Sequence, residues 1–287
     1  MAQHTHAPRR RVVITGVGAV TPLGNSVQAT WQAMCRGESG GGRITRFDTS
    51  QTEVQIACEV KGFDPLAHFG AKEARKLDRF AQFALVAAEE ALQDAGLAVS
   101  GEPSDRVAVV MGSAIGGVTA YGQEQRLMFE RGARRVSPFA IPMLLSDAAA
   151  GQISMRFGIR GPNLNIVSAC ASAANAIGEA LEMLRHGRAD VALAGGSEAP
   201  IEPFILTAFH NMGALSQHNE DPPRASRPFD ATRDGFVAGE GAAILVLETL
   251  EHAQQRDAHI YAELIGYGVT SDARHITQPD VQGPARA

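Results

Sequence analysis

Residues 163–198 read NLNIVSACASAANAIGEALEMLRHGRADVALAGGSE, and this stretch decides the fold class. The run LNIV at 164–167 is short, apolar and partly β-branched, which is typical of a buried strand. Apolar residues then recur at helical spacing, at Ile177, Leu181 and Leu184. The run VALA at 191–194 predicts the next strand. The stretch therefore predicts a strand–helix–strand unit, with Cys170 at the turn into the helix.

The position of Cys170 has chemical consequences. At a helix N-terminus the backbone N–H groups and the helix dipole favour a thiolate, which is the form of cysteine that attacks carbonyl groups. The same N–H groups can stabilise the oxyanion that forms after the attack. The neighbouring residues are small, which leaves room for a substrate. A buried structural cysteine is the alternative interpretation, and position alone does not choose between the two.

The rest of the chain alternates strand and helix patterns. RVVITGVGAV, RVAVVMGS and GAAILVLE predict strands, and a further strand is predicted at 260–272. Helices are predicted at 72–96, where an apolar stripe ends at a glycine, and at 146–158. This alternation indicates a layered α/β protein with a largely parallel central sheet.

Composition excludes several classes of function. The chain has 287 residues and a net charge of −5, which gives no support for nucleic acid or a membrane surface as a partner. Its three cysteines form no CxxC pair, which argues against a zinc site or a disulfide framework and suits a reducing cytoplasm. The nine histidines lack metal-ligand spacing, and GVGAVT lacks the third glycine of a dinucleotide fingerprint. We therefore expect no metal and no cofactor.

Basic residues cluster in two places. Lys72, Arg75 and Lys76 lie at the start of one predicted helix, and Arg134 and Arg135 precede the sequence SPF. A solvated face is the simpler interpretation of each cluster. The functional interpretation is a docking surface for an acidic partner.

Four motifs together resemble a known family. SACASAANAIGEA, RADVALAGGSEA, ASRPFDATRDGFVAGEGAAILVLE and YAELIGYGVTSDARHIT are similar to motifs of the 3-oxoacyl-acyl-carrier-protein synthases, the condensing enzymes of fatty acid synthesis. The resemblance implies a thiolase-like, layered α/β/α/β/α fold with two related halves, each built on a five-stranded sheet. The first half would span 11–259 and the start of the second 260–287, with 1–10 as a disordered N-terminus.

The resemblance also implies a chemistry. Cys170 would accept an acyl group from acyl-carrier protein as a thioester. Malonyl-acyl-carrier protein would then lose carbon dioxide, and its carbanion would attack the thioester to give a 3-oxoacyl product two carbons longer. A covalent intermediate divides one difficult transfer into two easier steps. The implied partners are the acyl and malonyl forms of the carrier protein and a second copy of the chain, and the implied location is the cytoplasm.

Further site residues follow from the resemblance. Ile115 and Phe209 match positions that line the acyl pocket, and Asp272 and His275 match a mobile loop beside the active-site entrance. The carrier protein would bind the basic residues, namely Lys72, Arg75, Lys76, Arg134 and Arg135. The family also uses two histidines, a lysine and a glycine-rich oxyanion loop from its second half, and none of the nine histidines here fits those motifs.

Several rival functions remain. A polyketide ketosynthase shares the same chemistry, and a thiolase uses coenzyme A in place of the carrier protein. The chain-length subunit of polyketide systems normally lacks the nucleophile, so Cys170 counts against it. Because the catalytic histidines are missing from the chain as given, a truncated, non-catalytic protein that binds acyl groups or carrier protein is the alternative from a different class.

Overall fold

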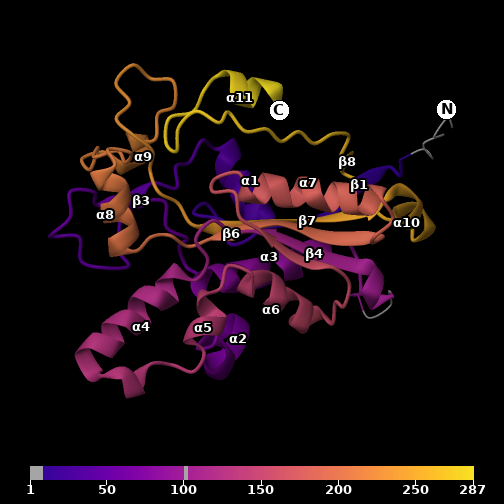
Figure 1. Cartoon of the computed structure of the whole chain (residues 1–287), viewed down its shortest axis with the longest axis horizontal. Coiled ribbons are helices and arrows are strands. Elements are labelled where there is room, and N and C mark those ends of the chain that lie inside the picture. Colours follow the sequence, from indigo (N-terminus) through magenta and orange to yellow (C-terminus); the bar gives the residue numbers. More distant parts are fainter. Residues whose placement is uncertain (1–8, 100–102) are drawn as a thin grey trace.

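A six-stranded sheet forms the centre of the molecule (Figure 1). The structure, a computed structural model, describes residues 9–99 and 103–287. The strand order is β5-β4-β6-β7-β1-β8. The strands are β1 (Val12–Val20), β4 (Val107–Gly112), β5 (Asn163–Ile166), β6 (Val191–Glu198), β7 (Gly241–Thr249) and β8 (Ala262–Glu263). A separate small sheet pairs β2 (Gly42–Arg43) with β3 (Ile56–Ala57).

The sheet is mixed, which corrects the expectation of a largely parallel one. Strand β4 runs parallel to β5 and β6, but β7 is antiparallel to both of its neighbours, β6 and β1, and β8 is antiparallel to β1. Alternating strand and helix patterns predict layers. They do not show that a late strand inserts between β1 and β6 in the opposite direction.

Helices cover both faces of the sheet. Helices α3 (Arg79–Asp94) and α6 (Ala148–Phe157) pack on one face, and α7 (Ser172–Arg185) packs on the other (Figure 1). Strand side chains alternate between the faces, as the twofold period of a strand requires. In β4, Val109 faces α3 and α6, whereas Val110 faces α7. Because both faces of the central strands are covered, β4, β6 and β7 are mainly apolar and buried. Strand β5 lies at the edge of the sheet and is partly exposed, which corrects the expectation of a buried strand at 164–167.

The remaining helices are short or lie at the periphery. They are α1 (Val27–Cys35), α2 (Pro65–Ala74), α4 (Val118–Arg131), α5 (Ala140–Leu144), α8 (Pro203–Asn211), α9 (Pro222–Ala225), α10 (Leu250–Gln255) and α11 (Gln282–Arg286). The 3₁₀ turns η2 (Ser104–Arg106) and η3 (Ala133–Arg135) also occur in the described part of the chain.

The single helix predicted at 72–96 is wrong in its first turns. Helix α2 ends at Ala74, and α3 begins only after Asp78. The Asp78 carboxylate accepts a hydrogen bond from the Phe80 N–H at 3.2 Å, which is the usual role of aspartate at a helix N-cap. The helical spacing of apolar residues continues across this break, so periodicity alone does not reveal it.

The strand predicted at 260–272 forms only over Ala262–Glu263. Beyond it the chain leaves the sheet edge and crosses α7 (Figure 1). Arg185 of α7 donates to the Ile265 carbonyl at 2.8 Å, and the Tyr267 hydroxyl donates to Asn175 at 3.3 Å. The chain beyond Glu263 thus contacts α7 and does not continue to pair with β1. With the short β8 at its edge, the sheet has six strands, one more than the five expected for each half of the fold.

The predicted disorder at 1–10 concerns mainly residues that lie outside the described ranges. Arg10 is described, and its guanidinium forms an ion pair with Asp190 at 2.8 Å. Asp190 also binds Arg106 at 2.8 Å. Hydrogen bonds and charge from Arg106, with a further contribution from Arg10, hold the pKa of Asp190 at about 2.

Candidate active site

Cys170 lies in a tight turn between β5 and α7, as the sequence predicts. Strand β5 ends at Ile166, and α7 begins at Ser172. Ala169 has a φ of +51°, in the left-handed region that residues with a side chain rarely adopt. This conformation costs on the order of 1 kcal/mol, so neighbouring contacts must stabilise it.

Side-chain hydrogen bonds hold this turn. The Ser172 hydroxyl accepts from the Ser168 N–H at 2.9 Å and donates to the Ala169 carbonyl at 2.7 Å. The Asn175 amide donates to the Ser168 hydroxyl at 2.7 Å, and Tyr267 in turn donates to Asn175. The serines around Cys170 therefore have a structural function that their small size alone does not indicate.

Two glycines let α7 approach the sheet closely. A Cβ atom on Gly112, at the end of β4, would lie 2.3 Å from the backbone of Ser172. A Cβ atom on Gly196 of β6 would lie 2.5 Å from the Cβ of Ala173. The N-terminus of α7 therefore sits directly against the ends of these strands, and this places Cys170 at the carboxyl edge of β4 and β6.

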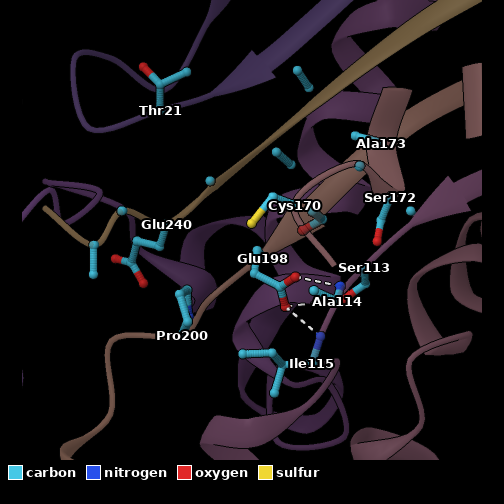
Figure 2. A pocket seen from close by; sticks show the side chains of 18 of the residues that line it. Thr21, Ser113, Ala114, Ile115, Cys170, Ser172, Ala173, Glu198, Pro200 and Glu240 are labelled. Carbon is cyan, nitrogen blue, oxygen red and sulfur yellow. Dashed lines mark hydrogen bonds between the residues drawn. The ribbon is translucent and has the colours of Figure 1, made fainter. Parts of the chain in front are cut away.

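A cavity of about 580 Å³ opens beside Cys170 (Figure 2). Its lining includes Ile115 and Phe209, the two residues expected to line an acyl pocket. The Phe209 ring packs edge-on against Phe236, with the ring centroids 5.3 Å apart. The other apolar lining residues include Ala169, Ala173, Pro200, Val237 and Ala238. The structure thus brings Cys170, the predicted nucleophile, and the two predicted pocket residues together in one apolar cavity.

The glycine-rich segment 235–241 forms part of the wall of the cavity. Gly235 and Gly241 have positive φ values of +146° and +152°, a backbone conformation that favours glycine. Glu240 in this segment has a fully buried side chain, and its carboxylate binds the Arg79 guanidinium at 2.7 Å. In the sequence, the only indication of this role of Glu240 was an acidic residue between two glycines, Gly239 and Gly241.

Glu198, at the end of β6, is the second carboxylate in the cavity lining that the sequence analysis missed. Burial raises the pKa of Glu198, while hydrogen bonds from Ala114, Ile115 and Ser113 act in the opposite direction. Its only signal in the sequence is an acidic residue at the end of an apolar strand.

Asp272 and His275 lie apart from the cavity that contains Cys170. Asp272 accepts hydrogen bonds from the backbone of Arg274 and Asp280, at 3.2 and 2.8 Å. His275 is exposed and accepts from the Thr277 N–H at 3.1 Å. Neither is among the described residues that line the cavity, and their function at its entrance stays a prediction.

One residue of the first basic cluster contacts the segment that follows the second cluster. Lys72 and Arg75 are exposed at the end of α2. The Lys76 ammonium lies 5.5 Å from the centre of the Phe139 ring, four residues beyond the exposed pair Arg134 and Arg135. We refer to Lys72, Arg75, Lys76, Arg134 and Arg135 as the basic patch.

Exposure does not by itself single out Cys170. Cys35 is also exposed, whereas Cys58 is half-buried and burial raises the pKa of its thiol.

No cluster of three or more histidine, cysteine or acidic side chains suited to a metal ion occurs in the described ranges. None of the described helices is both long enough and apolar enough to cross a membrane.

Comparison with known proteins identifies the family. The sequence model described as "Beta-ketoacyl synthase, N-terminal domain" matches residues 9–253. The chain is 48% identical to 3-oxoacyl-(acyl-carrier-protein) synthase 2 of Staphylococcus aureus strain N315, over 96% of the chain and 66% of that protein. It is 44% identical to the protein of the same name from Synechocystis, over 97% of the chain and 68% of the relative.

Solved structures give the same result. The ishigamide ketosynthase/chain length factor matches with a TM-score of 0.89 and 33% identity, over 97% of this chain and 68% of that one. The AntDE:AntF complex, a ketosynthase with its type II polyketide acyl-carrier protein, matches with a TM-score of 0.86 and 34% identity over the same shares. These matches confirm the thiolase-like fold, of which the chain covers the N-terminal half. The chain spans 66% of the length of its Staphylococcus relative, and it belongs to the beta-ketoacyl synthase family.

Proposed function

We propose that the protein is a 3-oxoacyl-acyl-carrier-protein synthase that extends fatty acyl chains by two carbons. The single observation that carries this proposal is the position of Cys170, exposed in a tight turn before α7 and beside an apolar cavity. An apolar cavity of about 580 Å³ suits an acyl chain, because burial of each methylene group is favourable. The similarity to two proteins named 3-oxoacyl-(acyl-carrier-protein) synthase 2 supports this substrate class.

In the first step the Cys170 thiolate attacks the carbonyl carbon of an acyl thioester. The bond to the carrier thiol breaks, that thiol takes up a proton, and the acyl group remains on Cys170 as a thioester. The oxyanion that forms during attack lies near the N-terminus of α7, where backbone N–H groups and the helix dipole favour negative charge.

In the second step malonyl-acyl-carrier protein loses carbon dioxide, and the electron pair of the broken carbon–carbon bond forms a carbanion. The carbanion attacks the thioester carbonyl and expels the Cys170 thiolate. The product is 3-oxoacyl-acyl-carrier protein. Two histidines, a lysine and an oxyanion loop that assist this step are expected from the second half of the family's fold, so the proposal for the whole reaction rests on the resemblance.

The basic patch is the proposed docking surface for the acidic carrier protein. Opposite charges chiefly increase the rate of encounter and fix orientation, and their effect decreases with salt. One structural relative is a ketosynthase in complex with its acyl-carrier protein, which supports a partner of this class.

We also propose a homodimer located in the cytoplasm. Strand β5 lies at the edge of the sheet, and on its outer side no described strand pairs with it. Leu164 and Val167 beside this edge are 41% and 58% exposed, which suits an interface. The cytoplasmic location is supported by three free cysteines, which suit a reducing compartment.

A polyketide ketosynthase is the second candidate, favoured by the two structural relatives named above. Their identities of 33% and 34% are lower than the 48% shared with the Staphylococcus relative, which supports fatty acid elongation as the first choice. Comparing rates with straight-chain and with polyketide starter thioesters would distinguish the two functions.

The test is transfer of an acyl group to Cys170, measured by the intact mass of the protein. Wild type should gain one acyl group from acyl-acyl-carrier protein, and Cys170→Ala should gain none. Reversing charge at Lys72 and Arg75 should slow transfer from the carrier protein but leave transfer from a small acyl thioester unchanged. Arg188→Glu is the matched control, since Arg188 is exposed just before the start of β6 and belongs neither to the basic patch nor to the free edge of β5.

One result would overturn the proposed function of Cys170, and another would overturn the proposed docking surface. If Cys170→Ala is acylated as readily as wild type, Cys170 is not the nucleophile. If the charge reversals slow both acyl donors equally, the basic patch is not a docking surface for the carrier protein. A protein that binds acyl-carrier protein without becoming acylated would instead be the non-catalytic alternative.

A further inference from the structure

Glu198 occupies a position that connects the cavity to the turn after β4. It is the last residue of β6, where it pairs with Gly241 of β7. Figure 2 shows its carboxylate directed toward the labelled residues Ser113, Ala114 and Ile115. All of these residues line the cavity beside Cys170.

The hydrogen bonds that Glu198 accepts come from this one turn. The Ala114 N–H donates at 2.6 Å and the Ile115 N–H at 3.3 Å, and the Ser113 hydroxyl donates at 3.2 Å. The same hydroxyl accepts from the Gly116 N–H at 3.1 Å. The carboxylate therefore serves as the common acceptor that fixes the backbone on which the Ile115 side chain is carried.

The opposite side of the turn is fixed by close backbone contact. Gly116 has a φ of +70°, and a Cβ atom there would lie 2.8 Å from Ser146. A Cβ atom on Gly117 would lie 1.9 Å from the carbonyl oxygen of Met143 in α5. The turn thus has no room to move toward α5. If its bonds to Glu198 are lost, we expect it to relax toward the cavity.

We propose that Glu198 is a positioning residue that sets the depth of the acyl cavity by holding Ile115, and so selects acyl-chain length. The inference rests on the proposed function for its substrate class. Because an N–H of Ile115 itself binds the carboxylate, displacement of that bond moves the residue whose side chain lines the cavity. One buried methylene group changes binding by roughly fourfold, so a small movement alters the chain-length preference measurably.

The variant Glu198→Gln tests this function with little change in volume. The amide has one acceptor oxygen, and its NH₂ group would face a backbone N–H, so at least one bond to the turn is lost. Glu202→Gln is the matched control. Glu202 is another half-buried carboxylate whose pKa burial raises, but it lies outside the described lining of the Cys170 cavity.

The probes are N-alkyl iodoacetamides with tails of 4 to about 14 carbons, and alkylation of Cys170 is followed by peptide mass mapping. In Glu198→Gln the ratio of long-tail to short-tail rates should change at least about fourfold, the effect of one methylene group. The rate with iodoacetamide itself should change less than about twofold, and Glu202→Gln should keep the wild-type ratio. Ile115→Ala should change the ratio too, and adding Glu198→Gln to it should have little further effect.

An unchanged tail-length ratio in Glu198→Gln, with a melting temperature like that of wild type, would overturn the inference. If Glu198→Gln does not fold, Glu198→Asp is measured instead, because the shorter carboxylate must also shift the turn. An effect that simply adds to that of Ile115→Ala would also count against it. The proposed function fails separately: if acyl-carrier protein transfers no acyl group to Cys170 in wild type, that function is wrong whatever the alkylation profile.

Discussion

The buried ion pair between Arg79 and Glu240 gives a quantitative prediction. The Arg79 side chain is 14% exposed and that of Glu240 is fully buried. Two guanidinium nitrogens bind the carboxylate at 2.7 and 2.9 Å, and the Val60 N–H donates to it at 3.0 Å. Removing one partner of a buried pair leaves an uncompensated charge and costs about 3–5 kcal/mol. Glu240→Gln should therefore lower the melting temperature by roughly 10 °C.

Removing both charges should restore most of this loss. In the double variant Arg79→Met with Glu240→Gln, no charge remains unpaired, and the glutamine oxygen can still accept from Val60. We expect the two changes to be strongly non-additive, with a coupling of at least about 2 kcal/mol. The exposed pair between Arg36 and Glu38 is the control, and its removal should change stability little.

The assay is urea unfolding followed by circular dichroism, with thermal melting as a second measurement. If the losses of stability from the two changes simply add in the double variant, the pairing of the two charges does not stabilise the fold, and the argument is refuted. A loss below about 1 kcal/mol in Glu240→Gln would also refute it, since that value belongs to exposed pairs.

Three further predictions concern other parts of the chain. Burial raises the pKa of Asp78 to about 6, so the folded state binds more protons than the unfolded state between about pH 4 and 6. The free energy of unfolding should therefore fall by roughly 3 kcal/mol as pH rises through that window. Urea unfolding of Asp78→Asn, which keeps a good N-cap, should show a smaller fall, and a fall equal to that of wild type would contradict this explanation. Gly178→Ala should cost about 1–3 kcal/mol in urea unfolding, because the new Cβ would lie 2.2 Å from the Tyr267 ring, and Tyr267→Ala should offset part of that loss. Iodoacetamide should alkylate Cys170 faster than Cys58, whose thiol pKa is raised by burial, and equal labelling in peptide maps would contradict this.

The parts of the fold that the sequence predicted best are those fixed by local periodicity. The strand and helix around Cys170 lie within about one residue of their expected bounds, since apolar spacing changes abruptly there. The break before α3 was not predictable from spacing, because it depends on capping by Asp78. The course of the chain after Glu263 depends on contacts with α7, which lie far away in the sequence.

The candidate site shows the same division. The position of Cys170 in the turn before α7 was predictable from the local pattern, and the expectation that Ile115 and Phe209 line a pocket followed from the resemblance. Glu198 and Glu240 were missed, because their significance arises from partners distant in the sequence, such as the turn after β4 and Arg79. A single acidic residue beside glycines gives no indication of which distant N–H groups or cations it will bind.

The order of the strands has a consequence for how the chain folds during synthesis. Val12 in β1 pairs with Thr249 in β7, and β7 separates β1 from β6 in the sheet. At roughly 5–20 residues per second, a ribosome needs on the order of ten seconds or more to synthesise the segment between these two residues. Until β7 emerges, β1 cannot join the rest of the sheet, and its apolar surface depends on α3 for cover. Such non-local pairing makes folding slow, so we expect the nascent chain to need protection from aggregation until residue 249 has left the ribosome.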